Sequence, residues 1–114
     1  PRLGIPVPEA MQPIIRECQL TGFAHAARQW QIPLRQAACG YLWGWLENIT
    51  LAGVKIIPLG QTSGQAIIAS MSEQIPQLVT RGLALSDEAI GASNPAQALA
   101  SCLHETQYTR IFRS

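Results

Sequence analysis

The longest helical pattern in this sequence covers residues 34–65, LRQAACGYLWGWLENITLAGVKIIPLGQTSGQ. Its first apolar stripe follows the spacing of one helix face and consists of Ala38, Leu42, Trp45, Ile49, Ala52 and Ile56. A second stripe beside it consists of Trp43, Leu46, Thr50, Gly53 and Ile57. Because a helix that is apolar on two faces is surrounded by other helices, the pattern predicts a central buried helix from about Leu34 to Ile57.

A shorter helical segment precedes the central one. It begins at Glu9 or at Pro13, which suits a first helical turn, and it ends near Trp30. Pro33 pushes the residue before it out of the helical region, so the chain turns there. Because the connection is short, the two helices should pack antiparallel. Pro58 ends the central helix, since its ring cannot continue the hydrogen-bond ladder.

Two further helices follow. One runs over about residues 64–83 and contains Pro76, which should kink or split it. Asn94 as N-cap and Pro95 at the first helical position start the last helix, which continues to about Glu105. Its predicted buried residues are Ala98, Leu99, Cys102 and Leu103. Since no alternation typical of β-strands is present, the sequence predicts an all-α helical bundle without a sheet.

The turn between the central and third helices, GQTSGQ at residues 60–65, invites comparison with a phosphate-binding loop. A Walker loop needs a lysine that reaches the phosphates, and none follows these glycines. The turn is better interpreted as a helix cap, in which Thr62 or Ser63 accepts the first free N–H groups.

Composition adds the expectation of a protein partner. Charged residues make up 13% of the 114-residue chain and hydrophobic residues 47%, against a usual charged share of about 25%. One small domain cannot hide that much apolar surface, so a partner or self-association is expected. The net charge of +1 gives no reason to expect nucleic acid. Residues 41–59 are too interrupted by Glu47, Asn48 and Lys55 to favour a membrane span.

The sequence contains no recognisable catalytic set. Its three cysteines are widely spaced, which predicts neither a disulfide framework nor a zinc site and fits a reducing cytosol. His25 is interpreted as a packed or half-exposed histidine and not as a ligand. Cys102, His104 and Glu105 form a weak metal-like cluster, but residues at these spacings do not converge on one side of a helix. The residues alone therefore predict a helical interaction module.

The C-terminal residues 106–114, TQYTRIFRS, mix aromatic and arginine side chains. This composition is typical of interface hot spots, whereas chain ends are disordered unless they are tied down. Composition alone favours neither interpretation.

Three stretches resemble the urease accessory protein F (UreF) family: YLWGWLEN through AGVKIIPLGQ at residues 41–61, the spacer GASNP at 91–95, and the terminus HETQYTRIFRS at 104–114. The resemblance covers nearly the whole chain. Because the family is about twice this long, it implies that residues 1–114 are one all-α region, the C-terminal half of a larger helical domain. Residues 1–8 contain three prolines and a glycine, which predicts an extended linker or loop, while the resemblance makes residues 106–114 a docking tail.

The resemblance also implies a function. Members of the family are all-α cytoplasmic proteins that are not enzymes in their own right. They bind a second accessory protein, D (or H), and the accessory GTPase G, and they dimerise. The assembly delivers nickel to urease apoprotein, so nickel is the metal of the pathway rather than a cofactor of this chain.

Site residues follow from the same resemblance. The expected contacts with the D/H protein are His104, Glu105, Tyr108, Arg110, Ile111, Phe112, Arg113 and Ser114. The residues expected to stabilise the helix junction or contact a partner are Lys55, Gly60, Gln61 and Gln65. The alternative function is a nickel-binding module that uses Cys102, His104 and Glu105.

Overall fold

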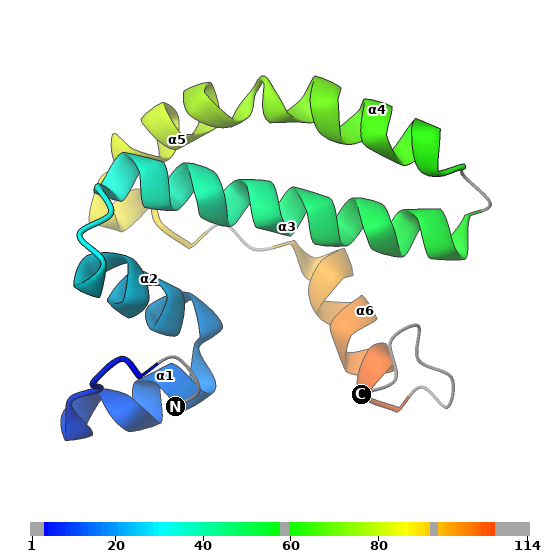
Figure 1. Ribbon diagram of the computed structural model, residues 1–114. Helices are drawn as coiled ribbons and strands as arrows, with labels where there is room; N and C mark the ends of the chain where they lie inside the picture. The colour runs from blue at the N-terminus through cyan, green and yellow to red at the C-terminus, as the bar shows by residue number, and fades with distance from the viewer. Residues whose placement is uncertain (1–3, 58–59, 92–93, 107–114) are drawn as a thin grey trace.

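The computed structural model describes residues 4–57, 60–91 and 94–106, and this part of the chain contains α-helices and 3-10 turns but no strand (Figure 1). The elements are η1 (Glu9–Met11), α1 (Gln12–Glu17), α2 (Gln19–Gln29), α3 (Leu34–Ile56), α4 (Gln61–Ser72), α5 (Ile75–Leu83), η2 (Asp87–Ala89) and α6 (Pro95–Glu105). The predicted all-α class is therefore confirmed.

The first predicted helix is divided in two. Cys18 adopts an extended conformation, with φ −127° and ψ 105°, between α1 and α2. The two short helices pack on each other, and Ile15 of α1 lies against Gly22 of α2. The prediction of one continuous helix was wrong because this tertiary contact requires a bend that helical propensity does not reveal.

A tight turn joins α2 to α3, as Pro33 predicted. Gln31 has a positive φ of 56°, and the Ile32 N–H donates to the Ala27 carbonyl oxygen at 2.9 Å. Pro33 is the N-cap of α3. The turn sends α3 back above α2, so that α2 lies beneath the first part of α3 (Figure 1).

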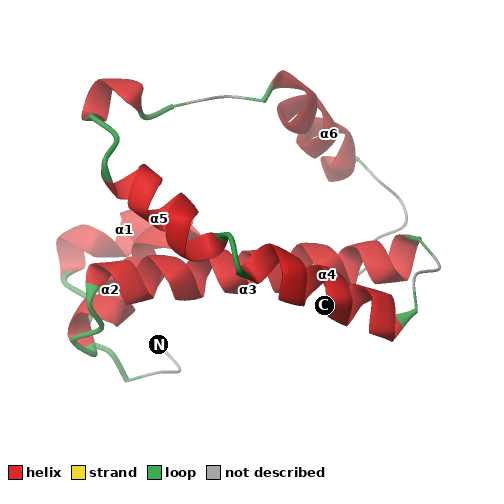
Figure 2. Ribbon diagram, turned by 90° about the horizontal axis from the view of Figure 1, so that it is seen from above, coloured by secondary structure: helices red, strands yellow, loops and turns green. Residues whose placement is uncertain are grey.

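The long helix α3 is central, since it contacts α2, α4 and α5 (Figures 1 and 2). Its end agrees with the prediction, because Ile57 is already extended before Pro58. Its burial does not agree: within α3 only Thr50 is buried. The helix α2 packs beneath α3 while α4 and α5 pack above it, and Trp45, Ile49 and Ile56 of the first apolar stripe remain exposed (Figure 1).

The helices α4 and α5 arch together over α3 (Figure 1). They are separate because the predicted split at Pro76 occurs, with Pro76 in the first turn of α5. The predicted cap at Thr62 or Ser63 was wrong. The helix α4 begins earlier, at Gln61, with Gly60 as an N-cap that makes no side-chain hydrogen bond.

The last helix, α6, lies apart from the group formed by α3, α4 and α5 (Figures 1 and 2). Its predicted start is confirmed, because the Asn94 side chain accepts hydrogen bonds from the N–H groups of Ala96 and Gln97 at 3.1 and 3.4 Å. Its predicted burial is wrong: Ala98, Leu99, Cys102 and Leu103 are all exposed. The apolar face of α6 has the predicted pattern without a helix packed on it.

The core of the described part is small. Its buried apolar residues are Ile5, Ala27, Ile75 and Val79. His25 is also buried, and its Nε2–H donates to the Pro6 carbonyl oxygen at 2.8 Å, which confirms it as a packed histidine. No helix in the described ranges is both long and apolar enough to cross a membrane.

Candidate interaction surface

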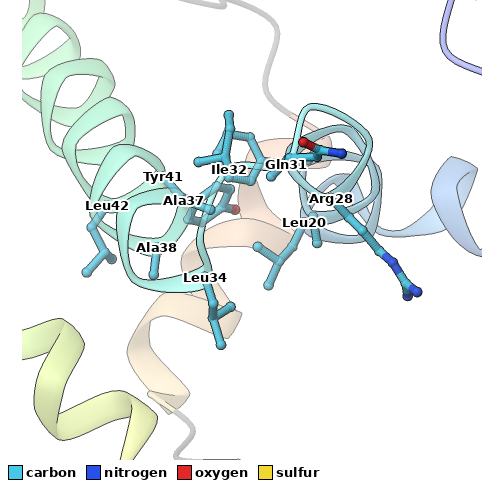
Figure 3. Close-up of a pocket in the computed structure, with 12 residues that line it drawn as sticks. Leu20, Arg28, Gln31, Ile32, Leu34, Ala37, Ala38, Tyr41 and Leu42 are labelled. Carbon is cyan, nitrogen blue, oxygen red and sulfur yellow. The ribbon is translucent and has the colours of Figure 1, made fainter.

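An apolar groove of about 720 Å³ lies between α2 and α3 (Figure 3). We call it the α2–α3 groove. Its lining residues are Leu20, Phe23, Ala24, Ala27, Arg28, Gln31, Ile32, Leu34, Ala37, Ala38, Tyr41 and Leu42. Phe23 and Tyr41 hold its two walls together through tilted rings whose centroids are 5.2 Å apart.

The chemistry of the groove is almost entirely apolar. Arg28 is its single charged lining residue, and Figure 3 shows the Arg28 side chain extending away from Ala37 and Tyr41. Leu20 and Leu34 are exposed at the groove. Such a surface offers an apolar contact rather than a site for acid–base chemistry.

The groove continues into the first apolar stripe of α3, because Ala38 and Leu42 belong to both. We call the residues Ala38, Leu42, Trp45, Ile49, Ala52 and Ile56 the α3 stripe. Trp45, Ile49 and Ile56 remain 55%, 49% and 65% exposed. Large apolar side chains that gather on one face in this way mark an interaction surface.

A second hollow, of about 550 Å³, lies between α3 and the first turns of α4. It brings together Lys55, Gln61 and Gln65, three of the residues singled out from the sequence, whereas Gly60 stands outside it as the N-cap of α4. Gly64 is buried at its base, against Thr50 and Val54. The hollow therefore lies at the helix junction.

The residues of the nickel alternative do not form a site. Cys102, His104 and Glu105 are all exposed on α6. Across residues 4–57, 60–91 and 94–106, no group of three or more His, Cys, Asp or Glu side chains is arranged to hold a metal ion. The nickel alternative therefore gains no support from the described part of the chain.

His104 and Glu105 lie in the last turn of α6, next to the predicted docking tail. The other tail residues, Tyr108, Arg110, Ile111, Phe112, Arg113 and Ser114, lie outside the described residues. Their role stays a prediction.

Sequence reasoning missed the α2–α3 groove. The signal was present, because both helices carry apolar residues toward the Pro33 turn. The sequence predicted that these two helices pack on each other, and α2 does meet α3 at Phe23 and Tyr41, but a hollow remains beside that contact.

Comparison with known proteins adds a family. Residues 5–72 match the family model described as UreF. The urease accessory protein UreF of Alcanivorax borkumensis is 51% identical over 94% of this chain and 48% of its own length. The protein of the same name from Pseudomonas putida strain W619 is 45% identical over 92% of this chain and 47% of its own length.

The UreF protein of Alkalilimnicola ehrlichii is 51% identical over 82% of this chain and 41% of its own length. The chain thus spans about half the length of the curated relatives it matches. No solved structure gives a significant match. On the family model and these relatives together, the chain belongs to the UreF family of urease accessory proteins.

Proposed function

We propose that this chain acts in urease maturation as a non-catalytic scaffold. It binds the D/H accessory protein and the accessory GTPase G during the GTP-dependent insertion of nickel into urease apoprotein. The match to the UreF family carries this proposal, since the matched relatives are named urease accessory proteins. The proposed location is the cytoplasm, where the three free cysteines would remain reduced.

The exposed apolar face of α6 supports a scaffold. A scaffold acts by presenting contact surfaces, and Leu99 and Leu103 are 64% and 66% exposed on this helix, next to the tail. Exposed apolar side chains that gather on one face mark an interaction surface.

We place the D/H contact at the chain end. Tyr108, Ile111 and Phe112 supply apolar anchors, while Arg110 and Arg113 donate forked hydrogen bonds to acidic groups of the partner. His104 and Glu105 precede them on the exposed last turn of α6 and extend the same contact. Lys55, Gln61 and Gln65 are assigned to the junction of α3 and α4, whose hollow they line.

Co-purification tests the proposal. The tagged chain is produced with the D/H protein and GTPase G, and we expect both to be captured with it. Removal of residues 107–114 should abolish capture of the D/H protein. This deletion keeps Thr106, whose hydroxyl donates to the Leu103 carbonyl oxygen at the end of α6, so the circular dichroism of the helices should not change.

A pair of double substitutions separates specific docking from a general effect of charge. Arg110→Ala with Arg113→Ala should lose the D/H protein. Arg16→Ala with Arg81→Ala removes two exposed arginines from α1 and α5 and should retain it. A tail-less chain that still captures the D/H protein would disprove docking by the tail. A full chain that captures neither protein would disprove the scaffold.

A further inference from the structure

The α2–α3 groove and the α3 stripe form one apolar surface that no described helix covers. The helix α3 is packed by α4 and α5 on another side, and α6 lies apart from it (Figure 2). The large side chains along it remain open to solvent, since Leu34, Trp45 and Ile56 are 70%, 55% and 65% exposed. Gly44 lies with Phe23, Tyr41 and Trp45 around a smaller hollow next to the groove.

The chemistry of this surface defines its occupant. A surface that combines apolar side chains with one outward-pointing arginine binds an apolar stripe rather than a charged ligand. Its shape, a furrow between two helices, fits a third helix, because helices pack by laying the ridge of one into the groove of its neighbours. The occupant is therefore an amphipathic helix.

The length of the relatives points to the source of that helix. This chain spans 48%, 41% and 47% of the three relatives compared, so about half of each relative lies outside the match. We propose that a helix from this other half of the UreF-family chain occupies the α2–α3 groove and covers the α3 stripe. The residues of the α3 stripe are then buried in the core of the full-length family fold, and such burial is what their helical periodicity predicts.

The test uses a defined probe. The probe is the part of the Alcanivorax borkumensis relative that lies outside its match to this chain, produced together with the 114-residue chain. We expect a 1:1 complex in sedimentation. Tryptophan emission should shift to the blue on binding, because Trp45 leaves water.

Two substitutions should weaken the complex. Ala38→Glu places a charge on the floor of the groove, and Trp45→Gln removes the largest side chain of the stripe. Each should raise the dissociation constant at least about tenfold, because a buried charge or a lost aromatic anchor is costly at an interface. Ala38 lines the open groove and Trp45 is 55% exposed in the chain alone, so its helix content should be unchanged.

Each variant has a matched control. Ala66→Glu makes the same change at an exposed alanine of α4. Trp30→Gln removes a tryptophan that is 57% exposed, close to the 55% of Trp45, and does not line the groove. Both controls should leave the dissociation constant within about twofold of the unsubstituted value.

Three outcomes would overturn the inference. The first is failure of the unsubstituted chain to bind the probe, and the second is equal weakening by Ala38→Glu and Ala66→Glu. The third is a dimer of the chain alone that Ala38→Glu dissociates, since the occupant would then be a second copy. The assay contains no urease, nickel or GTP, so its failure is distinguishable from failure of the scaffold proposal.

Discussion

The Cγ2 atom of Val54 lies 2.8 Å from the position that a Cβ atom would take on Gly64. This contact joins the last turns of α3 to the first turns of α4, and Gly64 is buried there. Glycine is present because α4 approaches α3 too closely for a larger residue. Glycine at this position therefore sets the separation of the two helices.

Gly64→Ala should lower the free energy of unfolding. Overpacking costs ~1–3 kcal/mol, while replacing Gly by Ala inside a helix gains ~1 kcal/mol, so we expect a net loss of up to ~2 kcal/mol. Val54 cannot turn aside easily because its χ1 angle is restricted in a helix. Thermal unfolding followed by circular dichroism measures the effect.

Two further variants control this experiment. Gly53→Ala, in α3 with no atom within 4 Å of the added Cβ, should stabilise the chain. Val54→Ala combined with Gly64→Ala should recover part of the loss, since the clash is removed. A Gly64→Ala chain as stable as Gly53→Ala would mean that α3 and α4 separate without cost.

His25 should fix the segment that precedes η1. Its Nε2–H donates to the Pro6 carbonyl oxygen, and the adjacent Ile5 is buried. His25→Ala should destabilise the chain by ~1–2 kcal/mol, because a partly buried carbonyl loses its donor. Hydrogen exchange should show faster opening around Ile5.

His25→Gln provides the comparison for this variant. Glutamine retains an N–H donor at the end of its side chain, so it should preserve more of the protection than alanine does. Equal exchange rates in the two variants would show that shape, and not the hydrogen bond, holds the segment.

Asn94 should stabilise α6 without affecting the stability of the other helices. Asn94→Ala removes the side-chain oxygen that accepts from Ala96 and Gln97, which costs ~1 kcal/mol of helix stability. Because α6 lies apart from α3 (Figure 2), exchange should rise in α6 and remain constant in α3 and α5. Asn48→Ala, at an exposed position inside α3, should leave exchange in α6 unchanged.

Cys18 should react with an alkylating reagent at a lower pH than an ordinary cysteine thiol does. Hydrogen bonds from the Thr21 side chain and backbone lower the pKa of the Cys18 thiol, because they favour the thiolate. The midpoint of the alkylation rate against pH should therefore lie below that of an ordinary cysteine.

Thr21→Val tests the cause of this reactivity. It removes the side-chain hydrogen bond, the larger contribution, and should move the midpoint to higher pH. Thr80→Val, on α5, should have no effect. If the midpoint does not move in Thr21→Val, the backbone hydrogen bonds would account for the lowered pKa of Cys18.

Proline residues and one N-cap made several of the helix boundaries predictable. Proline at positions 33, 58 and 76 cannot continue a preceding helix, and Asn94 with Pro95 satisfies the first groups of the next one. These signals act within a few residues, so they did not depend on the surrounding structure.

Burial was harder to predict, because periodicity shows which face of a helix is apolar and not what covers it. The α3 stripe was recognised correctly as a face, yet Trp45 and Ile49 are half-exposed in this chain. The break at Cys18 was not predicted for a related reason. The break depends on the contact of Ile15 with Gly22 across the bend. The candidate site was therefore predictable in composition but not in shape.

The length of α3 has a consequence for the two hollows. Ala38 in the α2–α3 groove and Val54 in the second hollow are 16 residues apart on one uninterrupted helix, or ~24 Å along its axis. Because α3 is one unbroken helix, it holds the two hollows at a constant spacing, so a change at one end of α3 leaves the distance between them unchanged.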